Sequence, residues 1–127
     1  LATDVDGPEV TSVSMAPLNG TSGTAFLFTG QATDPSGVAT MELQYYTPQG
    51  ASVAFQCSLN HDVEVTCTRS IEAGNVPPLN FSGTYTFWHV FAQDALGNES
   101  RYWNNGGVSG IEGISSHSLS VPNFVIN

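Results

Sequence analysis

Short segments of alternating apolar and polar residues, each closed by a turn signal, recur along the whole chain and constrain its fold. In "AFLFTGQAT", for example, Phe26, Phe28 and Ala32 share one face of an extended strand with Gly30. No stretch longer than a few residues carries the 3.6-residue apolar period of a helix. The segments that we expect to form strands are 9–15, 24–33, 38–46, 52–57, 63–69, 84–94, 99–103 and 117–126.

Seven or eight short strands at this spacing predict an all-β fold, arranged as a two-sheet Greek-key β-sandwich. The chain has 127 residues, of which 40% are hydrophobic, enough to bury one core. It shows no internal repeat. We therefore expect a single domain over residues 1–127.

Strand parity predicts which side chains enter the core. In "MELQYY" the inward residues are Met41, Leu43 and Tyr45. Counting back from the end of the segment 84–94, the expected inward residues are Trp88, Val90 and Ala92, and the expected outward residues are Phe87, His89 and Phe91. Tyr85 also has the character of a core residue but falls on the wrong parity, which a β-bulge between Tyr85 and Trp88 would reconcile.

The charge balance excludes several classes of function. Eleven acidic residues stand against two arginines, and the formal net charge is −9. Nucleic acid and anionic membrane surfaces would repel such a chain, and no apolar run approaches the roughly 20 residues of a membrane helix. The histidines at 61, 89 and 117 are scattered, and no catalytic motif accompanies them. We therefore do not expect an enzyme.

The two cysteines lie symmetrically about a turn-like Asn-His-Asp sequence at 60–62. This symmetry predicts a hairpin on which Cys57 and Cys67 face each other and form a disulfide. A zinc site is the alternative, but two cysteines with only His61 nearby lack the usual four-ligand spacing. The disulfide would place the protein in an oxidising compartment, as a secreted or cell-surface protein.

Three stretches in order, "TDVDGPEVTSVSMAP", "ATDPSGVATMELQYY" and "GTYTFWHVFAQDALGNES", resemble the bacterial immunoglobulin-like and fibronectin-III-like repeats of secreted hydrolases and surface adhesins. The resemblance implies an immunoglobulin-like Greek-key β-sandwich of seven to eight strands. It also implies a non-catalytic spacer or adhesion module, often stiffened by calcium, whose partners are adjacent modules of the same chain. The start "LATDVDG" has neither an initiating Met nor a basic region, so we expect the chain to come from a longer protein.

In such a sandwich, acidic residues from three segments would meet at one pole. The candidate ligands are Asp4, Asp6, Asp34, Asp94 and Asn98. Calcium takes six to eight oxygen ligands at flexible angles, which carboxylates and an amide from separate loops can supply. The alternative is that Asp34 and Asp94 only cap turns, since Asp is common before such turn sequences.

An aromatic sheet face suggests a second function, the binding of carbohydrate or of a surface protein. Its expected members are Tyr46, Phe87, His89, Phe91, Tyr102 and Trp103. The alternative, which we favour from the sequence, is that the segment 104–117 folds back over these rings and turns them into a small second core. In the resembled family a short final strand would stand here, and this segment interrupts it.

Overall fold

The structure is a computed structural model that describes residues 4–74 and 79–127; residues 1–3 and 75–78 of the predicted domain lie outside the described residues. Its strands are β1 (Glu9–Ala16), β2 (Asn19–Gly20), β3 (Ala25–Thr33), β4 (Val38–Tyr46), β5 (Ser52–Ser58), β6 (Glu64–Glu72), β7 (Gly83–Asp94), β8 (Glu99–Trp103), β9 (Val108–Ser109) and β10 (Phe124–Ile126). No helix occurs among these residues, so none is available to cross a membrane. The all-β prediction is confirmed, although only residues 124–126 of the expected strand 117–126 are extended in a sheet.

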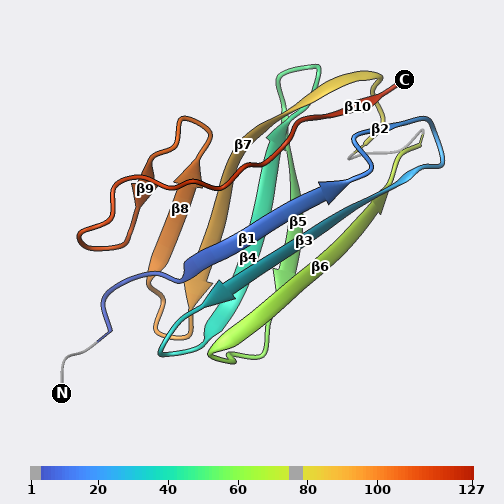
Figure 1. Cartoon of the computed structure of the whole chain (residues 1–127). Coiled ribbons are helices and arrows are strands. Elements are labelled where there is room, and N and C mark those ends of the chain that lie inside the picture. The colour runs from blue at the N-terminus through green and yellow to red at the C-terminus, as the bar shows by residue number, and fades with distance from the viewer. Residues whose placement is uncertain (1–3, 75–78) are drawn as a thin grey trace.

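The strands form two sheets that lie face to face (Figure 1). The smaller sheet has the order β1-β3-β6, and the larger has the order β2-β10-β7-β4-β5. Two strands share one edge of β7, since β10 pairs with residues 83–85 and β8 pairs with residues 89–93. The predicted two-sheet arrangement is therefore present.

The short strand β2, which follows β1, pairs in parallel with β10 near the end of the chain. In the pair of β2 with β10, Asn19 lies opposite Val125 and Gly20 lies opposite Ile126. The backbone amide of Val125 donates to the carbonyl of Leu18 at 2.9 Å, and that of Asn127 donates to the carbonyl of Gly20 at 2.7 Å. This pairing connects the chain that continues from β1 to the larger sheet.

The core lies between the two sheets and is rich in aromatic rings. The predicted inward residues of β3 and β4 are buried, namely Phe26, Phe28, Ala32, Met41, Leu43 and Tyr45. Gly30 faces the same space, and a Cβ there would approach the side chains of Phe28 and Met41 to 2.7 and 2.8 Å. These two large side chains therefore need glycine at this position.

A β-bulge in β7 changes which of its aromatic residues are buried. Gln44 of β4 pairs with His89, whereas the next residue, Tyr45, pairs with Phe87, so Trp88 is the extra residue. Tyr85 and Phe87 consequently point into the core together with Val90 and Ala92. The predicted inward position of Trp88 and the predicted outward position of Phe87 are both wrong. The expected bulge is present, and Trp88 itself forms it.

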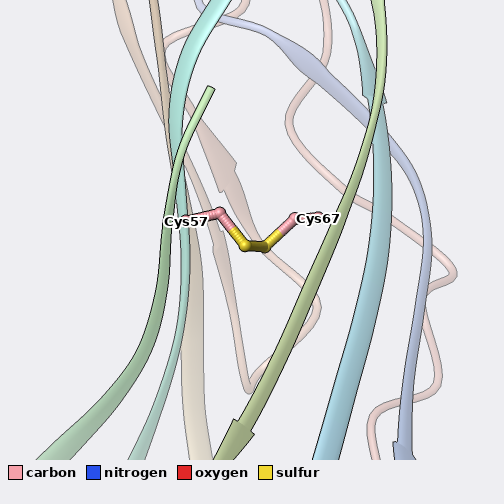
Figure 2. Close-up of a disulfide and its surroundings, with 2 residues drawn as sticks. All are labelled: Cys57 and Cys67. Carbon is pink, nitrogen blue, oxygen red and sulfur yellow. A yellow bond between two sulfur atoms is a disulfide. The ribbon is translucent and has the colours of Figure 1, made fainter. Parts of the chain in front are cut away.

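The disulfide between Cys57 and Cys67 joins the two sheets (Figure 2). Its Cα atoms are 5.8 Å apart, within the normal range for a disulfide. Cys57 is on β5, which pairs with β4, and Cys67 is on β6, which pairs with β3. The predicted pairing of the cysteines is confirmed, but the predicted hairpin is wrong because the chain crosses from one sheet to the other between them.

The segment after β8 closes the edge of the sandwich near the start of β1. The backbone amide of Gly7 donates to the carbonyl of Gly110 at 2.9 Å, and His117 Nε2 lies 2.7 Å from the carbonyl oxygen of Trp103. Apolar side chains of this segment, including Ile111 and Leu119, pack against the main core. Within the segment 104–117, Val108 and Ile111 pack against the main core rather than forming a separate second core with each other.

Candidate functional site

Three aspartates from distant segments converge at one pole of the sandwich. Asp4 precedes β1, Asp34 follows β3, and Asp94 is the last residue of β7. Each offers a carboxylate oxygen, and these three oxygens lie within 4.8 Å of one another. Asp34 and Asp94 are only 3% and 2% exposed. We call these residues the aspartate cluster; a group of this kind could hold a metal ion.

Local turns hold the two buried aspartates in place. The backbone amide of Ser36 donates to Asp34 Oδ2 at 2.9 Å, and the amides of Leu96 and Asn98 donate to Asp94 Oδ1 at 2.9 and 2.8 Å. Both turns are therefore capped, as the turn-capping alternative requires. Capping alone does not account for the approach of the two loops to each other and to Asp4.

Two further polar side chains position Asp4 in the aspartate cluster. Ser36 Oγ donates to Asp4 Oδ2 at 2.8 Å. The Asn98 amide nitrogen donates to the backbone oxygen of Asp4 and to Asp94 Oδ2, both at 2.9 Å. Sequence reasoning missed Ser36, although the "DPSG" turn placed a hydroxyl two residues after Asp34. Asn98, predicted as an oxygen ligand, instead presents its amide nitrogen and clamps Asp4 to Asp94.

Asp6 does not join the aspartate cluster. Its Oδ1 accepts a hydrogen bond from the backbone amide of Glu112 at 2.9 Å. The side chain therefore faces the segment after β8, and the prediction that Asp6 lies among the metal ligands is not supported by its position. Asp6 does line, together with Asp4 and Asp34, a pocket of about 300 Å³ that adjoins the cluster.

The crowding of the aspartate cluster can be relieved by a bound cation or by a proton that Asp34 shares with Asp4. Burial, together with the neighbouring charges of Asp4 and Asp94, raises the pKa of Asp34 to about 7. The hydrogen bond from Ser36 lowers the pKa of Asp4. The chain has two arginines and no lysine, and Arg101 lies over the ring of Phe91, 4.7 Å from its centroid. A cation among these oxygens would hold Asp34 in its ionised form.

The predicted aromatic face is divided between the core and the surface. Phe87 is in the core, and so is Tyr102, whose hydroxyl accepts from the amide of Val10 at 2.9 Å and contacts the carbonyl of Pro8 at 3.1 Å. The predictions that these two rings belong to a surface platform are wrong. The remaining four residues, Tyr46, His89, Phe91 and Trp103, lie on the outer side of the larger sheet, and Trp88 joins them through the bulge.

His89 is a buried residue within this outer group. It is 4% exposed, and its Nδ1 has no hydrogen-bond partner among residues 4–74 and 79–127. Burial, with a smaller effect of the Arg101 charge, lowers the pKa of His89 to about 4. The imidazole is therefore neutral at physiological pH.

We expect acid to weaken the fold through His89. Its pKa is about 4 in the folded protein and about 6.5 in an unfolded chain. The stabilisation associated with the neutral ring is fully present above about pH 6.5 and is lost as the pH falls through about 4, by up to about 3 kcal/mol. The measurement is the free energy of urea unfolding between about pH 7.5 and pH 4, for the protein and for His89→Gln. The protein should lose more stability than the variant; parallel curves would contradict this prediction.

No protein-family model matches the sequence. A search of curated proteins also finds no significant match.

Proposed function

We propose that the protein is a non-catalytic, immunoglobulin-like module of a larger secreted or cell-surface bacterial protein, stabilised by calcium and acting as a spacer or adhesion module. The observation that carries this proposal is the aspartate cluster, in which three separate segments contribute carboxylate oxygens within 4.8 Å of one another. A cation bound there would tie the start of β1 to the β3–β4 and β7–β8 turns. The module would then be stiffest at this pole.

Two features support the immunoglobulin-like assignment. Strands β1, β3 and β6 oppose a larger sheet in which β5, β4 and β7 are consecutive neighbours and β2, β8, β9 and β10 add further short strands, and this two-sheet arrangement supports a sandwich of that family. The hydroxyl of Tyr85, near the start of β7, donates to the carbonyl of Phe81 four residues upstream at 2.9 Å and accepts from its amide at 3.3 Å. This is the geometry of a tyrosine corner, a recurrent feature of immunoglobulin-like sandwiches.

The ligand chemistry supports calcium over other cations. All three side chains of the cluster offer oxygen, whereas zinc sites in proteins usually include cysteine or histidine. Magnesium requires near-ideal octahedral geometry, but calcium accepts irregular sets of six to eight oxygens. Asp4, Asp34 and Asp94 would supply the carboxylates, with carbonyl oxygens and water completing the shell. The inter-sheet disulfide supports the extracellular location, where calcium is abundant.

Calcium should raise the melting temperature of the protein, and Asp34→Asn should abolish this response. Calcium at about 100 times its Kd would add roughly 2.7 kcal/mol to the free energy of unfolding, or several degrees. In chelator, Asp34→Asn should melt no lower than the parent protein, because the amide removes one of three crowded negative charges. Differential scanning calorimetry in excess calcium, excess magnesium and excess chelator measures these effects.

The matched control is Glu72→Gln, which makes the same charge change on an exposed residue of β6 that pairs with Ala25 of β3. This variant should keep the full calcium response. If the parent protein melts at the same temperature in calcium and in chelator, the aspartates are turn caps and the calcium proposal fails. A similar loss of stability for Asp34→Asn with and without calcium would lead to the same conclusion.

A further inference from the structure

Aromatic side chains form a continuous row across three neighbouring strands on the outer side of the larger sheet. The ring of Tyr46 on β4 stacks on Trp88 of β7, with 4.8 Å between centroids and 25° between planes. The centroid of the His89 ring lies 4.4 Å from that of Trp88 and 5.0 Å from that of Trp103 on β8. We call Tyr46, Trp88, His89, Phe91 and Trp103 the aromatic face. Apart from His89, these residues are exposed or partly exposed, and Tyr46 is 37% exposed.

Side chains that donate hydrogen bonds and side chains that accept them lie between these rings. Gln44 pairs with His89 across the β4–β7 ladder, and Glu42 pairs with Phe91. Gln44 Nε2 donates to Glu42 Oε2 at 2.8 Å. On the other side of Phe91, Arg101 of β8 provides guanidinium donors. The surface therefore combines apolar ring faces with amide, carboxylate and guanidinium groups.

The charges of this surface favour an uncharged ligand. Glu42 and Arg101 flank Phe91 from opposite sides, and Glu99, which pairs with Gln93 on the same side of the sheet, adds a second carboxylate that disfavours an anionic ligand. The whole chain carries a formal net charge of −9, which repels polyanions and also a second copy of the same chain. A sugar chain presents apolar C–H faces and hydroxyls that both donate and accept, which matches stacked rings with polar groups between them.

His89 provides an independent sign that a polar partner is missing. The ring is 4% exposed and lies beside Trp88 and Trp103, while its Nδ1 has no hydrogen-bond partner in the described part of the chain. Buried polar atoms without a partner are unusual in folded proteins because their desolvation is not compensated. Because Nδ1 is itself buried beside the two indole rings, one of these rings would move to let a ligand hydroxyl supply the missing hydrogen bond.

We propose that the aromatic face binds an uncharged polysaccharide, with Trp88, Trp103 and Tyr46 stacking on its sugar rings and Gln44, Arg101 and His89 bonding its hydroxyls. The site lies on the outer face of the larger sheet, and its ligand contacts do not include the aspartate cluster. Binding therefore does not depend on the proposed calcium site.

Native gel electrophoresis in gels that contain a soluble polysaccharide tests the proposal. The probes are hydroxyethylcellulose, xylan, galactomannan and β-1,3-glucan, with alginate as an anionic comparison. We expect at least one neutral probe to retard the protein equally in calcium and in chelator. Trp88→Ala and Trp103→Ala should each weaken this interaction by about tenfold, as expected for loss of one stacked ring. The control, Phe81→Ala, removes an aromatic side chain that is 41% exposed elsewhere and should bind like the parent protein.

Circular dichroism and thermal melting establish that each variant is folded, and Tyr46→Ala replaces any tryptophan variant that is not. The proposal is overturned if none of the four neutral polysaccharides retards the protein. It is also overturned if the folded variants of the aromatic face are retarded as strongly as the parent protein, or if alginate alone retards it. A loss of retardation confined to chelator would assign the binding to the calcium site instead.

Discussion

Phe124→Ala should reduce the free energy of unfolding by about 3–5 kcal/mol, the range for large aromatic residues replaced by alanine in a core. Phe124 is fully buried at the end of the chain. Its ring centroid lies 4.7 Å from that of Phe26, and 4.8 Å from those of Tyr45 and Tyr85. Because these rings come from β3, β4 and β7, the substitution would leave a cavity between the two sheets.

Urea unfolding followed by circular dichroism measures this effect, with Val125→Ala as the neighbouring control. Val125 is only partly buried in the same strand, so its truncation should cost about 1 kcal/mol. A loss for Phe124→Ala no larger than that for Val125→Ala would mean that β10 does not close the core as described.

Removing the disulfide should reduce the free energy of unfolding by about 2–3 kcal/mol, because an unfolded chain without it gains conformational freedom. The suitable protein is the double variant Cys57→Ala/Cys67→Ala, since alanine leaves no free thiol in the buried position of Cys67. Urea unfolding with and without a reducing agent measures the change.

The reducing agent should lower the stability of the parent protein toward that of the double variant and leave the double variant unchanged. Non-reducing mass analysis of the oxidised parent protein should show the two cysteines linked. An unfolding midpoint of the parent protein that does not respond to reduction would contradict the inter-sheet link.

Sequence parity predicted the core wherever a strand is regular. β3 and β4 alternate without interruption over their inward residues, and each predicted core residue there is buried. In β7 the alternation changes at Trp88, because the register with β4 shifts between Gln44 and Tyr45. Counting back from Asp94 therefore gave the correct faces for Val90 and Ala92 and the wrong ones for Phe87 and Trp88. Tyr85 was the local sign of this change.

The strand partners of the two cysteine segments depend on long-range pairing, which local symmetry in the sequence does not reveal. The sequence between Cys57 and Cys67 is symmetric enough to predict a hairpin, yet β5 finds its partner in β4 and β6 finds its partner in β3. The proximity of the two cysteines was nevertheless predictable, because both segments alternate about the same short connection. Opposed sheets bring such residues together as effectively as a shared ladder would.

The candidate site was predictable at the level of loops and less so at the level of atoms. Asp34 and Asp94 stand where strands end, so the sequence placed them at one pole. The direction of the Asp6 side chain depends on Glu112, more than a hundred residues away, which no local pattern encodes. The orientation of Asn98 likewise follows from its contact with the backbone of Asp4.

The parallel pairing of β2 with β10, together with the pairing of β1 with β3, would bear tension applied along the chain. In Figure 1 the described residues before β1 and the residues after β10 leave from opposite ends of the sandwich. Tension between them would pull β2 back toward β1 and β10 forward toward Asn127, so the hydrogen bonds between these two strands would be sheared together. Strands loaded in this way resist extension more strongly than strands that open one bond at a time. The lifetime of the fold under force would then be set by the unfolding barrier at these contacts, rather than by its equilibrium stability.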